Sequence, residues 1–377
     1  MKLKLTRSGG MRTLGPLVFL ECDALAEFVT TWRKIVRGET RGVHGAALRA
    51  ALWLLQWPYR AAVWLRNSTT KPPFRAAVPV LCVGNLSVGG TGKTACVEFI
   101  AKKLRTQGAQ VVILSRGYAA GSQSRNDEAM VLEANLPDVP QLQSPDRVAL
   151  AMLAVEELEA EMLLLDDGFQ HRRLHRDVDI VLIDASEPLS ACWPLPRGTW
   201  REPLSALRRA TAVILTRVDQ ATPEQLAFWR QTLAYRVPDV PVAEAVHAPT
   251  HVLQLHAPEL SCDVLRGLDV VAFCGLGHPE AFFATLRSLG ALIVECKVFS
   301  DHHNYTRNDV DELIQFARAR NCAFVTTQKD WVKLQVAELD GKPLYALKVD
   351  FVITAGEEQL NAMLTSLIPD SISGEAA

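Results

Sequence analysis

A stretch with the residue types of a phosphate-binding loop follows an apolar run. Residues 83–94 read VGNLSVGGTGKT and lead into the helix-like segment ACVEFIAKKLRTQG. Glycines let successive backbone N–H groups turn toward phosphate oxygens, a helix N-terminus adds partial positive charge, and a lysine meets the β- and γ-phosphates. Thr94 can in addition ligate Mg²⁺. The predicted nucleotide-binding residues are Ser87, Gly89, Gly90, Thr91, Gly92, Lys93 and Thr94.

Two adjacent carboxylates, Asp166 and Asp167, end a second apolar run, MLLLDD. A phosphate loop needs an acidic metal partner at the end of a neighbouring strand. Two such carboxylates repel each other unless a cation lies between them and the nucleotide. We therefore interpret Asp166 as a metal-side carboxylate and Asp167 as a residue close to the reaction.

Three further stretches carry more polar residues than a turn requires. SRGY (115–118) follows a predicted strand where ligands of open α/β sheets bind, so Arg116 and Tyr118 are candidate substrate contacts. NDE (126–128) supplies a second pair of carboxylates, and DHH (301–303) an Asp–His pair at another strand end. A kinase that acts on an alcohol benefits from a carboxylate or imidazole that accepts the hydroxyl proton.

Short apolar runs alternate with helical segments along most of the chain. Runs of five to seven residues between helices indicate strands buried on both faces of a mostly parallel sheet. The strands of the first set are predicted at 78–84, 109–117, 160–167, 178–184 and 210–217. A second βα alternation begins near residue 268 and indicates a smaller α/β domain. We predict an N-terminal segment (1–75), a P-loop NTPase-type α/β core (76–250), a C-terminal α/β domain (251–367) and a disordered tail (368–377).

Composition excludes some classes of protein and leaves one question open. The net charge of −2 argues against nucleic acid as a partner, and eight scattered cysteines without a C-x-x-C pair indicate a reduced, cytoplasmic protein. No apolar run reaches the roughly 18 residues of a spanning helix. Residues 47–66, rich in Trp, Leu and Arg, fit a helix lying in a membrane interface or one packed on its own domain. Residues 1–40 are expected to be partly ordered at most.

Two other classes of P-loop protein share parts of this pattern. Membrane-associated switch ATPases share the VGGTGKT pattern, but they carry a lysine where this chain has Val88. A GTPase would read guanine with Asp219, yet the usual Asn-Lys pair is replaced by Thr216 and Arg217. The loop WPLPRGTW (193–200) fits either a substrate contact or local packing.

Taken together, the motifs resemble the tetraacyldisaccharide 4′-kinase family over about residues 47–350. They include the phosphate loop, SRGY, DDGFQHRRLHRDVDIVLID, LPRGTWREPLSALRRA, GLGHPEAFFATL, DHH and VTTQKDWVKL. In this family the loop begins with Ser or Thr, which accounts for Ser87.

The resemblance implies transfer of the ATP γ-phosphate, with Mg²⁺, to the 4′-hydroxyl of tetraacyldisaccharide 1-phosphate in lipid A biosynthesis. The protein would lie at the cytoplasmic face of the inner membrane as a peripheral or monotopic protein, a monomer being favoured. An acylated glucosamine disaccharide is costly to lift into water, which favours the membrane-interface interpretation of residues 47–66.

Carried over by motif, the resemblance also implies site residues. Asp127 would act with His302 in accepting the hydroxyl proton, and Glu128 would join Asp166 on the metal side. The residues lining the transfer site would be Asp167, Gln170 and Arg201, with Asn85, Arg116 and Tyr118 as substrate contacts.

Overall fold

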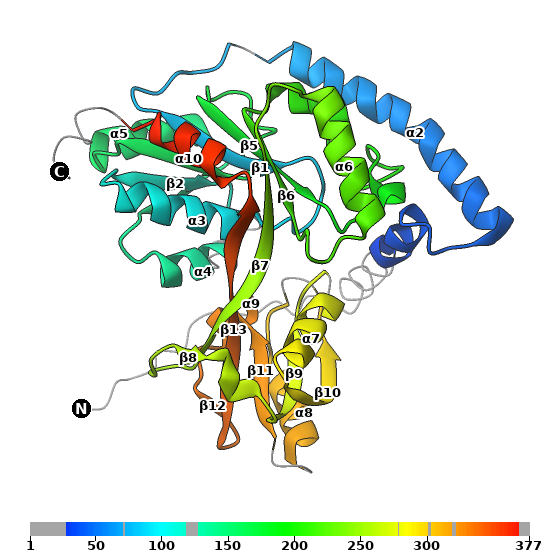
Figure 1. The fold of residues 1–377 in the computed structure, drawn as a ribbon, viewed down its shortest axis with the longest axis vertical. Helices are drawn as coiled ribbons and strands as arrows, with labels where there is room; N and C mark the ends of the chain where they lie inside the picture. The colour runs from blue at the N-terminus through cyan, green and yellow to red at the C-terminus, as the bar shows by residue number, and fades with distance from the viewer. Residues whose placement is uncertain are drawn as a thin grey trace, which may run out of the picture.

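Two lobes share one sheet in the computed structural model (Figure 1). The structure describes residues 28–70, 72–117, 127–277, 279–300, 303–318 and 322–368. The strands follow one another in the order β10-β9-β11-β13-β7-β6-β5-β1-β4-β2-β3, while β8 pairs with β7 and β12 with β13.

The first lobe contains a parallel sheet built from the predicted apolar runs. All five predicted strands are present, and the sixth, β3, was not predicted because its residues QLQ lack an apolar run. The strands are β1 (Val80–Asn85), β2 (Val111–Ser115), β3 (Gln141–Gln143), β4 (Met162–Asp166), β5 (Val178–Asp184) and β6 (Ala212–Thr216).

Helices cover both faces of this sheet, as predicted. Leu164 of β4 packs into the core on one face, whereas its neighbours Leu163 and Leu165 pack into the core on the other. One face is covered by α3 (Lys93–Thr106), α4 (Asp127–Asn135) and α10 (Glu357–Thr365). The opposite face is covered by α5 (Arg147–Glu157) and α6 (Pro223–Arg236).

The second lobe repeats the βα alternation on a smaller scale. Its parallel strands are β9 (Asp269–Cys274), β10 (Leu292–Val298) and β11 (Ala323–Thr327). Its helices are α7 (Pro279–Ser288), α8 (Arg307–Arg318) and α9 (Gln328–Leu334). Two short strands, β8 (Leu260–Ser261) and β12 (Glu338–Leu339), lie against the long strands.

Two long antiparallel strands, β7 (Val242–Leu253) and β13 (Lys342–Ala355), run through both lobes (Figure 1). β7 begins beside β6 in the first lobe, and β13 pairs with β11 in the second. The expected boundary near residue 250 therefore falls inside a continuous strand.

The chain also returns to the first lobe at its C-terminal end. Phe351, Leu360 and Leu364 belong to the core beneath α3, and Ile368 packs against it. This differs from the expectation that residues up to 367 belong to the second domain. Of the expected tail, residues 369–377 lie outside the described part of the chain.

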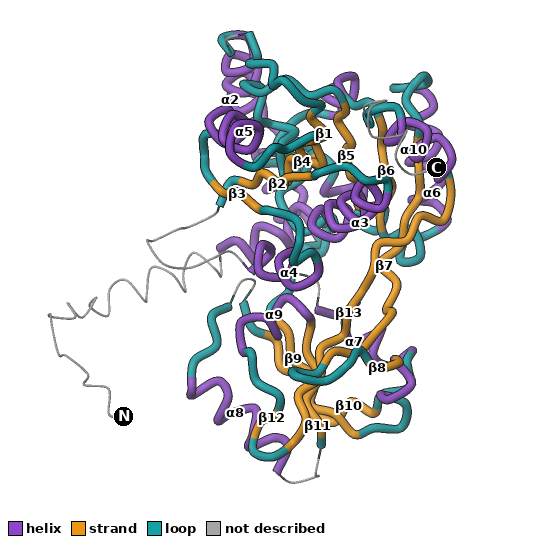
Figure 2. The backbone as a smooth tube through the Cα atoms, turned by 90° about the vertical axis from the view of Figure 1, so that its left-hand side faces the viewer, coloured by secondary structure: helices purple, strands orange, loops and turns teal. Residues whose placement is uncertain are grey.

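Helix α2 (Gly42–Ser68) lies along the outside of the first lobe and is longer than the predicted 47–66 (Figures 1 and 2). A shorter helical segment, residues 28–36, precedes it and is docked by the indole of Trp32, which donates to the Pro196 carbonyl at 2.8 Å. Of residues 1–40, the structure thus describes residues 28–40, while residues 1–27 lie outside the described part of the chain. Within the described residues, no helix is both long and apolar enough to cross a bilayer.

The packing of α10 predicts that Leu364→Ala destabilises the protein. Leu364 is fully buried, and removal of its side chain leaves a cavity in the core of the first lobe. We expect a loss of about 2–5 kcal/mol in the free energy of unfolding. Urea denaturation measures it, with exposed Gln359→Ala as the control on the same helix. An equal stability of both variants would contradict the assignment of α10 to this core.

Candidate active site

The phosphate loop connects β1 to α3, as predicted. Gly92 caps α3 in the left-handed region with φ +85°, and a Cβ at this position would lie 2.2 Å from His247 Nε2. Gly89 also has a positive φ, +140°. Side chains other than hydrogen are therefore excluded at Gly92 by both conformation and space.

The side chain of Asn85 stabilises the phosphate loop by hydrogen bonds. Its side chain is fully buried, and its amide nitrogen donates to Thr91 Oγ1 at 3.0 Å and to Ser87 Oγ at 3.3 Å. The Thr216 hydroxyl donates to the Thr91 carbonyl at 3.1 Å. The amide nitrogen of Asn85, a predicted substrate contact, therefore holds the loop in this structure.

The loop WPLPRGTW packs against the outer side of the phosphate loop. The Val88 N–H donates to the Thr199 carbonyl at 2.7 Å, and the Arg201 N–H donates to the Leu86 carbonyl at 2.5 Å. These contacts show local packing, one of the two alternatives left open by the sequence, while Thr199 and Trp200 of the same loop also line a cavity.

Asp167 lies between two cations at the carboxyl end of β4. Arg201 Nη1 donates to Asp167 Oδ2 at 2.9 Å and to Gln170 Oε1 at 3.3 Å, and Lys93 Nζ is 3.6 Å from Asp167 Oδ1. Burial alone would raise the pKa of Asp167, but Lys93 and Arg201 outweigh burial, so its pKa is lowered. The structure thus brings four predicted site residues together.

Asp166 has a different environment from its neighbour. Burial and the adjacent charge of Glu128 raise the pKa of Asp166 to about 7, although Lys93 opposes the shift. Glu128 lies in the first turn of α4, so two predicted metal-side carboxylates come from separate elements and face the same region. Their mutual repulsion indicates a place where additional positive charge is stabilising.

Asp127 links the two lobes. Its carboxylate lies at the start of α4, where Lys333 Nζ of α9 approaches Oδ2 to 3.1 Å and Lys329 Nζ approaches it to 3.7 Å. Lys333 also donates to the His303 carbonyl at 3.1 Å. One ammonium group therefore joins Asp127 to the loop that carries DHH.

The sequence analysis did not assign a role to Lys329 or Lys333. Both belong to VTTQKDWVKL, and their spacing of four residues puts them on one face of a helix. That spacing was the available signal, but which carboxylate the two lysines meet depends on how the lobes associate.

Two predicted residues, Tyr118 and His302, lie outside the described part of the chain. Arg116 is exposed and follows β2, next to β4 in the sheet. The adjacent His303 accounts for part of the DHH motif: its Nε2 is 3.0 Å from Asp309 Oδ2, and its ring stacks on Phe299.

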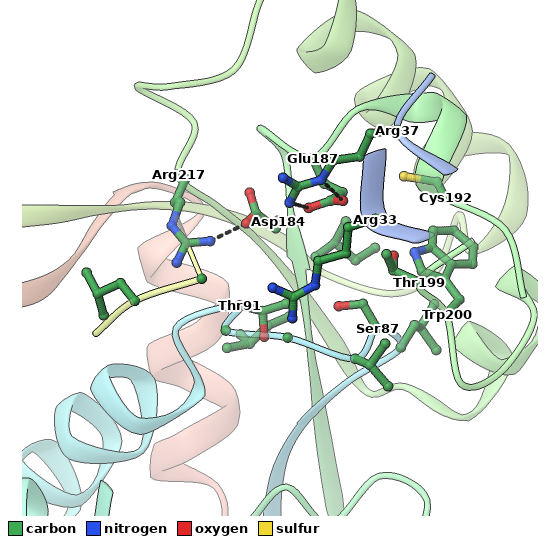
Figure 3. A pocket seen from close by; sticks show the side chains of 18 of the residues that line it. Arg33, Arg37, Ser87, Thr91, Asp184, Glu187, Cys192, Thr199, Trp200 and Arg217 are labelled. Atoms are coloured by element: carbon green, nitrogen blue, oxygen red, sulfur yellow. Dashed lines mark hydrogen bonds and ion pairs between the residues drawn. The ribbon is translucent and has the colours of Figure 1, made fainter. Parts of the chain in front are cut away.

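A cavity of about 150 Å³ adjoins the phosphate loop (Figure 3). It is lined by the loop from Leu86 to Thr91, by the end of β5 and by residues of both lobes. Arg217 forms an ion pair with Asp184 on its wall, and Arg37 pairs with Glu187 at 3.4 Å.

The parallel sheet, the glycine loop between β1 and α3 and the carboxylates at the end of β4 define a P-loop nucleotide-binding protein. The family model described as tetraacyldisaccharide-1-P 4′-kinase matches residues 48–369. The chain belongs to this family.

Named relatives agree with this membership. The chain is 41% identical over 350 residues to a tetraacyldisaccharide 4′-kinase from Anaeromyxobacter dehalogenans, a match that covers 86% of this chain and 92% of the relative. A Halothermothrix orenii protein of the same name is 34% identical, with 79% and 86% covered. The crystal structure of Aquifex aeolicus LpxK in complex with ATP is similar with a TM-score of 0.69 at 30% identity, covering 85% of this chain and all of that one.

The burial of His247 against Gly92 predicts loss of stability in acid. Burial and the charge of Arg217 lower the pKa of His247 to about 4, against 6.5 when unfolded. The unfolded state therefore takes up a proton first, so stability is full above pH 6.5 and falls as the pH decreases toward 4. The His247 contribution is about 3 kcal/mol.

Chemical denaturation of His247→Asn between pH 7 and pH 4 tests this shift. The variant should lose less stability across the range than the wild type, while His171, whose pKa is also lowered to about 4, keeps its contribution. The exposed His44→Asn variant serves as the control. Equal pH dependence in all three proteins would contradict the assignment.

Proposed function

We propose that the protein transfers the γ-phosphate of ATP to the 4′-hydroxyl of an acylated glucosamine disaccharide 1-phosphate, a step in lipid A biosynthesis. Family membership supports the substrate class. The observation that carries the chemistry is the convergence of Lys93, Asp167 and Arg201 beside the phosphate loop.

In this proposal Lys93 and the N-terminus of α3 hold the triphosphate. Asp167 keeps Lys93 and Arg201 in place, since it contacts both. Arg201 then offers a guanidinium to the negative charge that develops on the transferred phosphoryl group. Gln170 fixes the position of the Arg201 guanidinium, because its side chain accepts a hydrogen bond from Arg201 and donates one to the Asn85 carbonyl at 2.8 Å.

The residues near Asp166 suit Mg²⁺. The donors are the Thr94 hydroxyl and the carboxylates of Asp166 and Glu128, all oxygen ligands, and Mg²⁺ is usually bound by one or two carboxylates together with substrate phosphates. Burial and, after it, the charge of Glu128 raise the pKa of Asp166, and a cation would offset both effects. When bound, Mg²⁺ neutralises phosphate charge.

Asp127 is the proposed acceptor of the hydroxyl proton, with His302 as its partner. The 4′-oxygen attacks the γ-phosphorus, the bond from phosphorus to the bridging oxygen breaks, and ADP leaves. The hydroxyl proton passes to the Asp127–His302 pair. Lys333 supports this role by orienting the Asp127 carboxylate at 3.1 Å.

We propose further that α2 lies in the interface of the inner membrane on its cytoplasmic side. One stripe of the helix, marked by Gly45 and Gln56, is buried against the protein. The outward side carries exposed apolar residues, among them Leu54, Trp57 and Trp64. Its three arginines and lack of acidic residues suit anionic lipid headgroups.

Kinase activity is tested by transfer of ³²P from labelled ATP to tetraacyldisaccharide 1-phosphate in mixed micelles. Lys93→Ala removes the triphosphate contact, and Asp127→Ala removes the proton acceptor. We expect the Asp127 change to lower kcat by about 10²–10⁴-fold. The exposed Asp239→Ala variant is the control. Full activity of Asp127→Ala would move the base elsewhere, and ATP hydrolysis without lipid labelling would favour a switch ATPase.

Membrane binding is tested by co-sedimentation with vesicles that contain phosphatidylglycerol. Replacing Trp57 and Trp64 together with serine removes the largest apolar side chains from the outward side of α2, where they are 50% and 69% exposed. We expect at least a tenfold weaker partition, because each buried aromatic ring contributes about 1.5–3 kcal/mol. Leu292→Ser, at an exposed apolar position in the second lobe, is the control. Unchanged partition of the double variant would overturn the assignment of α2 to the membrane.

A further inference from the structure

The cavity beside the phosphate loop has one wall that the family match does not cover. The matched residues begin at 48, whereas this wall comes from residues 28–37, through Arg33 and Arg37. The opposite walls include Ser87 to Thr91 of the loop and Leu276, Gly277 and Lys329 of the second lobe.

The N-terminal wall is fixed in place by specific contacts. Val36 is fully buried, and the Trp32 indole donates to the Pro196 carbonyl at 2.8 Å. The Arg37 carbonyl accepts a hydrogen bond from the Ser190 hydroxyl at 2.7 Å, while its guanidinium donates to Glu187 at 3.4 Å. Residues 28–37 therefore present their side chains to the cavity in a defined orientation.

Arg33 is the side chain that this wall directs into the cavity. It is half-buried and extends toward the phosphate loop (Figure 3). Within the described residues its guanidinium forms no hydrogen bond or ion pair, whereas Arg37 and Arg217 on the same walls are paired with Glu187 and Asp184. A half-buried guanidinium without a carboxylate partner favours an anionic ligand.

The loop side of the cavity supplies donors of its own. In the part of the chain that the structure describes, the backbone N–H groups of Gly89 and Gly90 have no acceptor, whereas those of Val88 and Thr91 donate to the Thr199 and Gly89 carbonyls. Backbone N–H groups of a glycine loop and the guanidinium of an arginine can together donate hydrogen bonds to the oxygens of one phosphate group.

We propose that Arg33, together with the Gly89 and Gly90 amides, forms a phosphate-binding subsite that includes the N-terminal segment. The phosphate belongs either to the nucleotide or to the sugar 1-phosphate acceptor. The acceptor alternative rests on the proposed kinase function, but the nucleotide alternative does not. Arg33 thus adds a positive charge from outside the family-matched residues to the binding of a phosphorylated substrate.

The test compares the wild type with Arg33→Gln, Arg33→Lys and Lys34→Gln. Lys34 is exposed on the same helical segment, so its variant loses the same charge without facing the cavity. Titration calorimetry measures the Kd of MgATP without lipid, and the ³²P assay measures KM for tetraacyldisaccharide 1-phosphate at saturating MgATP. Thermal unfolding is recorded for each variant, and Arg33→Lys provides a variant that keeps the charge.

If the nucleotide is the ligand, Arg33→Gln raises the Kd of MgATP about tenfold, as for loss of one charge-assisted hydrogen bond. If the acceptor is the ligand, the same change raises only the lipid KM. In either case the affected constant of Arg33→Lys lies between those of the wild type and Arg33→Gln. Both constants of Lys34→Gln equal those of the wild type. Unchanged Kd and KM in Arg33→Gln, or equal effects of Lys34→Gln, would overturn the subsite. A wild type that binds MgATP but labels no lipid would contradict the kinase function. The Kd of MgATP in Arg33→Gln would then decide whether the subsite exists.

Discussion

The antiparallel pairing of β7 with β13 is the constraint on which the site depends. The pairing extends from Ala346 and Leu253 to Ala355 and Glu244, with two register shifts along it. Because each strand also pairs within a lobe, the backbone hydrogen bonds hold the two lobes in one sheet. Asp127 of the first lobe can meet Lys333 of the second only while this pairing is kept.

Electrostatics at the carboxyl ends of the strands follow from the same geometry. Parallel strands end at one edge, so Asp166, Asp167 and Asp184 collect there with little water around them. Asp167 and Asp184 are matched by cations, which makes burial tolerable. Asp166 is not matched by a cation in the same way, and this difference in charge distinguishes the region where we propose that metal and phosphate bind from the rest of the edge.

Much of the first lobe could be predicted because its strands are buried on both faces and therefore appear as uninterrupted apolar runs. The phosphate loop was equally predictable, since glycines and Lys93 act through local backbone geometry. The long-range pairing of β7 with β13 could not be predicted from apolar runs, because β7 contains His247 and Pro249 and lacks a continuous apolar run. The role of Lys333 was hidden for the same reason, because it depends on contact between residues about 200 positions apart.

The return of α10 to the first lobe makes the second lobe an insertion between two parts of one core. Leu360 and Leu364 complete a core whose other members begin at Leu81. During synthesis from the N-terminus, the first lobe must therefore wait for nearly the whole chain to leave the ribosome before its core can close. The apolar side of α2 emerges early in this interval, so its exposed side chains, among them Leu54 and Trp57, are presented to the cell before the nucleotide site exists.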